Sequence, residues 1–385
     1  MPRSTHRLPS KTLALAAALA AFSPLAGAQT STVTIYGSLD AYVAQQGGTG
    51  ISSRKVLNSG YNPNNLGFAG REDLGGGLAA GFTLEGQPSL DTGAMGQGGK
   101  MFGRQSNVWL EGGFGRVTAG RIHLPGRGFS IKYTATGWLS SDPLGNMALA
   151  VGSMFGPLMN GDAVGGRVSN ALMYSSPRGL GGFSFSALQS AGEGGPFSTG
   201  QAKLTQLAAG FTAGDFTADV VYAKIPELAG NQLPQTDYAF GAQYGFGGGF
   251  KVMGSYFSHQ GRSVAAPGGT TAIANSQGTD KTTLVGLTYT AGVHFIGASY
   301  GRTKVADAHR GRRPGNVTAP FSTVLDDMTG YSLAYTYSLS KRTQLFAAYG
   351  LLDNDALGSA SYTVDLRPTS GGKSTLTAAG IRHSF

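Results

Sequence analysis

The stretch that decides the fold is Tyr331-Ser332-Leu333-Ala334-Tyr335-Thr336-Tyr337-Ser338-Leu339. Every second residue in it is aromatic or aliphatic, and the residues between them are small or polar. Successive side chains of a β-strand point to opposite faces, whereas an amphipathic helix repeats its apolar residues every three or four positions. This period of two predicts a strand with one apolar and one polar face.

The same alternation recurs along the chain, for example over residues 33–43 and 216–224. Short Gly-rich turns and long polar connections alternate between these segments. The short turns are 73–76, 112–115, 213–215, 246–249, 291–292 and 340–342, and the long connections include 87–100, 225–235, 260–280, 305–327 and 354–373. About sixteen antiparallel strands, with tight turns at one end and large loops at the other, indicate an all-β transmembrane barrel.

A soluble β-sandwich or propeller also shows alternation, but two features argue against both. Asp40, Glu85, Asp219 and Lys251 lie on the faces opposite their apolar neighbours, and a dry core would not accept these charges. Aromatic residues also gather near the expected strand ends, as interface girdles require. These residues are Phe211 and Phe216, Tyr244 and Phe250, and Tyr337 and Phe346.

The last expected strand, residues 374–385, alternates up to a terminal Phe385. A strand at the edge of an open sheet leaves its backbone groups unpaired, which lipid does not tolerate. We therefore expect this strand to close onto the first one.

The first 28 residues are typical of a cleaved signal peptide. Arg3, Arg7 and Lys11 form a positive segment, residues 12–22 are apolar, and Ala26-Gly27-Ala28 fits a cleavage site. The apolar run is shorter than the roughly 20 residues that a membrane-spanning helix needs. We expect residues 29–385 to form one barrel domain exported through the periplasm.

The composition excludes several classes of protein. The chain contains no cysteine, which rules out disulfide-stapled scaffolds and thiolate metal sites. Only 13% of its residues are charged, against about 25% in typical soluble domains. The formal net charge of +9 is scattered rather than clustered, so we expect no nucleic-acid partner. The histidines show no ligand spacing, and we expect no metal and no cofactor.

Several motifs, in this order and spacing, resemble the general-diffusion porins of Gram-negative bacteria, in the branch typical of β-proteobacteria. They are Val33–Asp40, Leu66–Leu78, Phe102–Gln105, Gly112–Arg121, Tyr174–Pro177, Tyr337–Thr343 and Gly380–Phe385. Each motif alone is weak, but together they extend over nearly all of residues 29–385.

The resemblance implies a sixteen-stranded barrel in the outer membrane, surrounded by lipid and lipopolysaccharide and usually assembled as a homotrimer. It also implies a third extracellular loop, about residues 122–166, that folds inward and narrows the pore. Such a barrel passes small hydrophilic solutes and inorganic ions by diffusion and catalyses no reaction.

The expected pore-lining residues follow from the same resemblance. They are Arg104, Arg167, Arg71, Lys132, Asp142, Asp162, Tyr36 and Asp40. Strand parity places Arg104 on the face of Val108 and Leu110, whereas the resemblance places it in the pore. Ser38, Asn65 and Ala69 stand where related chains often carry Lys or Arg. Because basic groups outnumber acids, we expect a mild preference for anions. Gln105 and Asn107 are expected at a subunit contact.

Two other functions stay open. A substrate-selective channel would need a row of lumen aromatics, for which Tyr36, Tyr42 and Trp138 are the candidates. A plugged barrel that acts as an adhesin or structural protein would need a sticky apolar loop, and residues 147–159 approach one. The enzyme motif Gly297-Ala298-Ser299-Tyr300-Gly301 lies inside an alternating strand, whereas a nucleophile elbow needs a strand that turns into a helix.

Overall fold

The computed structural model describes residues 31–59, 63–136, 166–191, 203–226, 234–265, 274–314, 324–362 and 367–385. The expected signal peptide, residues 1–28, lies outside the described residues. So do two of the expected pore-lining residues, Asp142 and Asp162.

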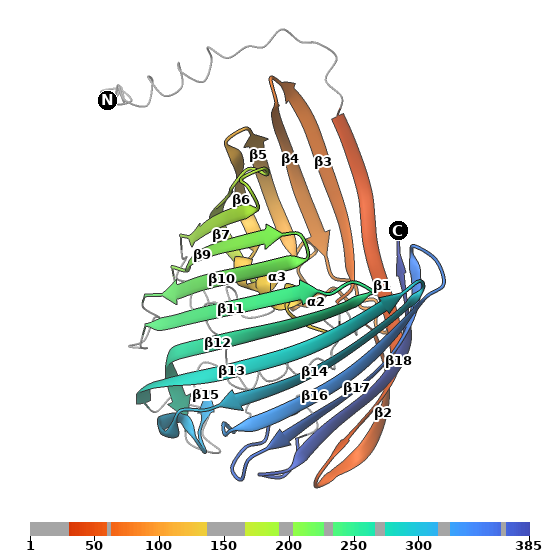
Figure 1. The fold of residues 1–385 in the computed structure, drawn as a ribbon, viewed down its shortest axis with the longest axis vertical. Coiled ribbons are helices and arrows are strands. Elements are labelled where there is room, and N and C mark those ends of the chain that lie inside the picture. The colour runs from red at the N-terminus through yellow and green to blue at the C-terminus, as the bar shows by residue number, and fades with distance from the viewer. Residues whose placement is uncertain are drawn as a thin grey trace, which may run out of the picture.

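The described strands form one antiparallel sheet that winds in sequence order into a barrel (Figure 1). Their bounds are β1 Ser31–Gly48, β2 Ile51–Ser59, β3 Asn65–Gly75, β4 Leu78–Gly86, β5 Gln105–Gly112, β6 Gly115–His123, β7 Arg167–Ser175, β8 Phe183–Ser190, β9 Thr205–Ala213, β10 Phe216–Ile225, β11 Gln235–Gly245, β12 Phe250–Ala265, β13 Ala274–Ala291, β14 His294–Lys304, β15 Arg313–Pro314, β16 Met328–Ser338, β17 Thr343–Asn354 and β18 Lys373–Ser384.

These segments make up the sixteen strands of the barrel wall. The second half of β1 pairs with β2 and its first half pairs with β3, so β2 and β3 together count as one strand of the barrel wall. The two-residue β15 pairs only with the end of β12. The predicted sixteen-stranded antiparallel barrel is confirmed.

The barrel closes where β1 meets β18. The register runs from Ser38 opposite Ser384 to Gly48 opposite Ser374, and the backbone amide of Phe385 donates to Gly37 O at 3.0 Å. Both chain ends therefore contribute to one seam, and neither terminal strand is left as an open edge.

The two faces of the sheet follow the alternation. In β16 the side chains of Tyr331, Leu333 and Tyr335 are exposed on the outside, and Ser332 and Ala334 are buried on the inside. The enzyme-like motif of residues 297–301 lies within β14, where Ser299 faces Ser332 across the inner face.

Aromatic residues stand exposed at the strand ends, among them Phe216, Tyr244, Phe250 and Tyr337. Phe346 is an exception to the expected girdle. It is buried on the inner face of β17, because its neighbour Leu345 takes the outer position opposite Tyr337. The prediction that Phe346 belongs to the outward-facing girdle is therefore wrong, and the adjacent Leu345 takes the outward position.

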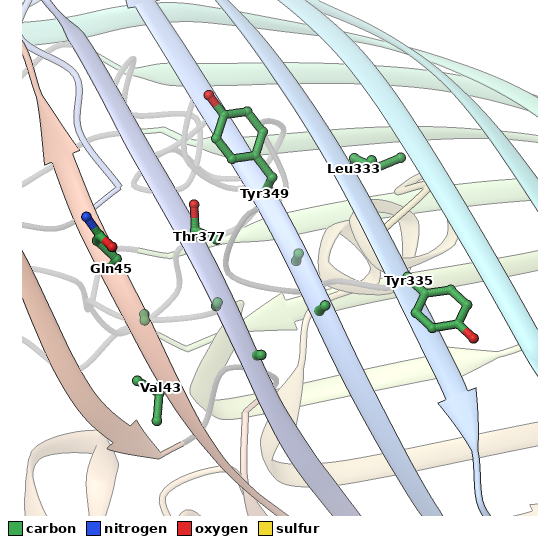
Figure 2. Close-up of a pocket in the computed structure, with 11 residues that line it drawn as sticks. Val43, Gln45, Leu333, Tyr335, Tyr349 and Thr377 are labelled. Atoms are coloured by element: carbon green, nitrogen blue, oxygen red, sulfur yellow. The ribbon is translucent and has the colours of Figure 1, made fainter.

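Small residues near the seam leave a hollow in the outer face of the barrel. Ala347 and Ala379 line it together with Val43, Leu333, Tyr335 and Tyr349, and the last four are labelled in Figure 2. The hollow encloses about 560 Å³ of space and is almost entirely apolar.

Within the described ranges, three short helical segments connect the strands: α2 (Gly96–Gly99), α3 (Pro125–Lys132) and a 3-10 turn, η1 (Asp307–His309). None of the helices in the described ranges is long and apolar enough to span a membrane. Helix α3 follows β6 and starts with Pro125 at its first position, where the missing amide hydrogen costs nothing. It contacts β9 and β10 from within the ring of strands (Figure 1).

Candidate functional site

A cluster of arginines lies where β5, β6 and β7 meet helix α3. Arg104 precedes β5, Arg167 begins β7 opposite His123, and Arg127 lies on α3. Arg104 and Arg167 are 6% and 2% exposed, and electrostatic interactions link Arg167 to both Arg104 and Arg127. Burying three like charges together is costly unless a counter-charge or water compensates them.

Glu85, near the end of β4, is the carboxylate within this cluster. Its Oε1 accepts Arg104 Nε at 2.5 Å, and its Oε2 accepts the hydroxyl of Tyr36 at 3.0 Å. Asn65 Nδ2 donates to the same Oε2 at 3.4 Å. Arg104 Nη1 is buried without a hydrogen-bond partner among the described residues. The described part of the cluster therefore holds three guanidinium groups and one carboxylate.

The contact with Glu85 explains why Arg104 faces inward, although the alternation of β5 would place it on the outer face with Val108 and Leu110. Val108 and Leu110 are 61% and 40% exposed on the outer face. Arg104 stands before the first residue of β5, and its backbone amide donates to Glu85 O at 2.9 Å. Free of the alternation, its side chain turns to the inner face.

The electrostatics of Arg127 follow from its surroundings. Burial and the positive charge of Arg104 lower the pKa of Arg127 to about 10, and the charge of Glu85 acts in the opposite direction. A pKa near 10 still leaves this guanidinium charged at neutral pH. Arg127 thus adds a positive charge to the cluster at neutral pH.

Helix α3 and the residues after it are anchored to the inner wall. The Gly126 amide donates to Gln206 Oε1 at 3.0 Å. The hydroxyl of Tyr133 donates to Asp219 Oδ2 at 2.5 Å, and Lys132 Nζ lies 2.6 Å from the same oxygen. Burial and the bond to Asp219 raise the pKa of Tyr133, so its hydroxyl stays a donor.

Apolar packing supports the same anchor. Phe129 lies 4.8 Å from Tyr133 and 5.3 Å from Phe257, measured between ring centroids. Val221, Ala239, Met253 and Leu284 complete this buried cluster inside the barrel.

Three wall glycines let the segment lie this close. A Cβ on Gly241 would meet the Tyr133 ring at 2.6 Å, and one on Gly286 would meet Ala135 Cβ at 2.6 Å. A Cβ on Gly297 would overlap the carbonyl oxygen of Ala135. Residues 124–136 therefore run along the inner wall from β6 as far as β14. Residues 137–165 lie outside the described residues.

The inward acids outside the cluster have basic partners of their own. Asp237 pairs with His259 at 2.5 Å, and Asp280 pairs with His309 at 2.9 Å. Arg310 contacts Asp326 at 3.4 Å and Asp327 at 2.8 Å. These contacts hold the connection between β14 and β16 against the barrel, and they leave few bare carboxylates.

The expected pore-lining residues fall into separate groups. Arg104, Arg167 and Tyr36 belong to the arginine cluster. Lys132 is bound to Asp219 on β10, away from that cluster. Asp40 is buried opposite Arg382 at the closing seam, where Arg382 Nε donates to Ser38 Oγ at 2.5 Å.

Arg71 lies at the end of the barrel that carries the short turns. It is half exposed, lies 3.5 Å from Glu111, and approaches the ring of Trp109 at 5.9 Å. Arg116 stacks on the same ring at 4.2 Å. These residues do not join the arginine cluster.

The prediction that Asn107 makes a subunit contact is wrong. Asn107 is 7% exposed and donates to Arg121 O at 3.1 Å. It shares the inner face of the barrel with Thr83 and Gly120, its register partners. Gln105, two residues before it and opposite Glu85, belongs to the same face.

Sequence reasoning missed Glu85, Arg127 and Tyr133 as members of the site. The acid at position 85 was visible as a charge on a strand, but its partner Arg104 follows a long connection whose path no local pattern sets. Within the described ranges, no three His, Asp or Glu side chains gather in a way that could hold a metal ion.

Comparison with known proteins shows the family of this chain. The family model described as Gram-negative porin matches residues 14–357. The chain belongs to the Gram-negative porins. Among curated relatives, an outer membrane porin protein of Bordetella pertussis is 27% identical, and the match covers 97% of this chain and 100% of the relative. Outer membrane porin protein 32 of Delftia acidovorans is 37% identical over 44% of this chain and 46% of its own length.

Solved structures share the fold of this porin. The anion-selective porin from Comamonas acidovorans superposes with a TM-score of 0.69 at 24% identity, over 92% of this chain and 100% of its own. A trimer form of the outer membrane protein OmpT of Vibrio cholerae gives a TM-score of 0.60 at 15% identity, over 92% and 100% of the two chains. As an outer-membrane barrel, the porin has its short turns on the periplasmic side and its long connections outside.

Proposed function

We propose that this porin passes small hydrophilic solutes and inorganic ions by diffusion, with a mild preference for anions. The observation that carries the proposal is the arginine cluster: among the described residues, Arg104, Arg127 and Arg167 gather beside one carboxylate, that of Glu85. Elsewhere in the described ranges, Asp237 and Asp280 contact histidines, and Asp327 is paired with Arg310. The printed name of the Comamonas acidovorans structure, an anion-selective porin, supports the same sign.

The mechanism is a filter rather than a reaction. A wide pore leaves solutes largely hydrated, so its selectivity comes from pore radius and from the field of the wall. The anchored segment 124–136 occupies part of the cross-section, and the neighbouring arginines raise the local anion concentration. Salt screens charges beyond about 8 Å at physiological ionic strength, which keeps the preference mild.

The test is the reversal potential of the refolded protein in a planar bilayer under a tenfold KCl gradient. Stepwise, ohmic conductance with a small potential that favours chloride is the expected result. A strong cation preference would overturn the assignment to the arginine cluster and leave the barrel standing.

Two other outcomes would favour the alternative functions. Saturable flux of one solute would indicate a substrate-selective channel. An absence of conductance steps, from protein shown to be folded, would indicate a plugged barrel. Both would overturn the diffusion proposal.

We also propose that the porin assembles as a homotrimer. The trimer form of the similarly folded Vibrio cholerae protein supports this, and the hollow beside the seam offers an outward apolar surface for contact (Figure 2). Cross-linking of the unheated protein in detergent should give a ladder that ends at three copies. A ladder that ends at one copy would overturn the proposal.

A further inference from the structure

A niche opens in the inner wall of the barrel close to the periplasmic turns. It encloses about 340 Å³, within the range of about 300–1,000 Å³ that small-molecule sites occupy. Strands β13, β14, β16, β17 and β18 form it, and Gly292, in the turn between β13 and β14, marks its periplasmic side. We name it the periplasmic niche. The side chains that set its chemistry are Phe295, Thr336, Ser338, Gln344, Phe346 and Arg382.

The register of the strands explains why these side chains meet. Thr336 on β16 stands opposite Phe346 on β17. Two residues further toward the periplasm, Ser338 stands opposite Gln344, which in turn stands opposite Arg382 on β18. Residues two apart along a strand project from the same face of the sheet. The niche therefore combines an apolar row and a polar row on the inner face.

Two aromatic rings give the niche its apolar wall. Phe346 is buried, and its ring lies over Gly380, where an added Cβ would meet ring atom Cζ at 2.6 Å. Phe295 on β14 stands opposite Thr336 and is partly buried. A Cβ on Gly297 would come within 3.3 Å of the Phe295 ring. Glycine at these two positions thus leaves the space that the rings occupy.

Arg382 gives the niche its charge, because none of the other described residues that line it is Asp, Glu, Lys or Arg. Its Nε donates to Ser38 Oγ at 2.5 Å. Neither Nη group makes a hydrogen bond or ion pair within the described part of the chain. The charge of Asp40, its register partner, attracts the guanidinium, and that of Arg104 repels it. The Nη groups are therefore donors that a ligand in the niche can use.

Neutral polar groups stand beside this guanidinium. Gln344 Nε2 lies 3.5 Å from Ser338 Oγ, which is long for a hydrogen bond, so both groups can turn toward a ligand next to Arg382. The histidine at the rim is already engaged, since His294 Nδ1 lies 2.8 Å from the hydroxyl of Tyr335.

We propose that the periplasmic niche binds a small aromatic monocarboxylate on its way through the pore. The planar fork of Arg382 matches a carboxylate, with which it forms short charge-assisted hydrogen bonds. The ring of the ligand packs against Phe295 and Phe346, because aromatic rings attract one another in edge-to-face and offset contacts. Ser338 and Gln344 hydrogen-bond the carboxylate from the side.

The same chemistry disfavours other solutes. A phosphate dianion would meet one guanidinium and an apolar wall, a neutral sugar would leave the guanidinium unsatisfied, and a cation would be repelled. The niche lies on β13 to β18, apart from the arginine cluster on β5 to β7 and α3. The inference rests on the proposed diffusion, since the ligand travels through the pore, and it adds a preferred class of solute. Its affinity must stay low so that the solute leaves.

The experiment is a titration of the refolded protein in detergent with benzoate, followed by ligand-observed NMR. The wild type should bind with a dissociation constant in the millimolar range. Arg382→Gln should bind at least about tenfold more weakly, the loss expected for hydrogen bonds to a charged group. Phe346→Leu should bind about threefold more weakly, because the ring contact is lost. The matched control is Arg71→Gln, which removes an arginine at the same end of the barrel but outside the niche and should bind like the wild type.

Arg382→Lys separates geometry from charge. It keeps the positive charge and loses the planar fork, so it should bind benzoate more tightly than Arg382→Gln and more weakly than the wild type. For the wild type, benzyl alcohol has the ring without the charge and acetate has the charge without the ring. Both should bind more weakly than benzoate.

Four results would each overturn the proposal: equal binding of benzoate by the wild type and Arg382→Gln, equal weakening in Arg71→Gln, equal affinity for acetate, and displacement of benzoate by inorganic phosphate at the same concentration. The melting temperature of each variant shows whether it is folded. If Arg382→Gln fails to fold because it loses the bond to Ser38, then Arg382→Lys and Phe346→Leu carry the test.

The bilayer measurement separates this proposal from the diffusion proposal. Conductance steps that favour chloride, from a protein that binds no benzoate, would overturn the niche and leave diffusion standing. Benzoate binding that depends on Arg382, from folded protein without conductance steps, would overturn diffusion and leave the binding site standing.

Discussion

Glu85 accepts hydrogen bonds from Arg104, Tyr36 and Asn65, and it is the carboxylate in the described part of the arginine cluster. Replacing Glu85 by Gln should strengthen the anion preference, because it removes a negative charge that lies beside the three guanidinium groups. Replacing Arg104 by Gln should weaken it. The reversal potential in the KCl gradient should shift in opposite directions for the two variants.

The same pair links selectivity to stability. Arg104 and Glu85 side chains are 7% and 6% exposed, and removing one partner of a buried pair costs on the order of 3 kcal/mol. Urea unfolding should show this loss for each single variant. Arg71→Gln is the control, because its half-exposed side chain at the periplasmic mouth should change both readouts little. Shifts of the reversal potential in one common direction would contradict this account.

The pKa of Arg127 predicts how selectivity depends on pH. Since that pKa is lowered only to about 10, Arg127 stays charged through pH 8 to 9. The contribution of Arg127 to the reversal potential, taken as the difference between the wild type and Arg127→Gln, should therefore stay constant in this interval and decline as the pH passes about 10, where the folded protein loses this charge. A decline that is complete below pH 9 would mean that another group supplies the field.

At the scale of elements, the segment 124–136 is a connection between strands that packs against the inner wall of the barrel. Its polar anchors are Gln206 and Asp219, and its close approach depends on glycine at three wall positions. We therefore expect the position of residues 124–136, which backbone contacts and charges both hold, to affect the size of the pore.

Gly297→Ala tests this coupling. The new Cβ would overlap Ala135 O and push the segment off the wall toward the pore axis, so single-channel conductance should fall. Gly254→Ala is the matched control, because its Cβ would meet nothing nearer than Leu284 O at 3.8 Å. Equal conductance of the two variants in a planar bilayer would show that residues 133–136 do not narrow the pore.

The elements differ in how well sequence predicts them, and the reason is physical. Residues 331–339 alternate strictly because one face meets apolar surroundings and the other does not, so local pattern alone identifies β16. Arg104 stands just outside its strand, and the alternation misplaces it. Phe346 was misplaced because a large ring fits either face, and only its neighbour Leu345 settles which one it takes.

The site depends on contacts that no local pattern encodes. Glu85 and Arg104 are brought together by the long connection between β4 and β5, whose path no local pattern predicts. Tyr133 contacts Asp219, which lies 86 positions away in the sequence. The resemblance to a family indicated which arginines to examine, whereas their carboxylate partners became visible only with the register. Gly241 and Gly297 carried no sequence signal, since glycine is frequent throughout this chain.

At the scale of the whole molecule, closure at β1 and β18 makes the barrel a ring without edges. In lipid, an open edge would leave a row of unsatisfied backbone groups, each costing several kcal/mol. The seam joins segments from the two ends of the chain, so it is the pairing of longest range in the fold. Stability of the whole ring should therefore depend on this one pairing.

A covalent bond across the seam tests closure directly, because the chain contains no cysteine of its own. Ala44 lies opposite Ala378, which lies opposite Ala348, so these three alanines form one row on the inner face. Cysteines at 44 and 378 should form a disulfide, since adjacent strands bring Cα atoms within the 4.4–6.8 Å that the bond needs. Cysteines at 44 and 348, two strands apart at roughly 10 Å, should not bond.

The oxidised 44–378 variant should resist heat unfolding on a non-reducing gel, and reduction should restore wild-type behaviour. The cross-link joins nearly the whole chain into one loop, and the chain-entropy estimate for so long a loop is about 6 kcal/mol. If the 44–348 pair bonded as readily as 44–378, the register at the seam would be wrong. The barrel would then have to close through a different pairing of its first and last strands.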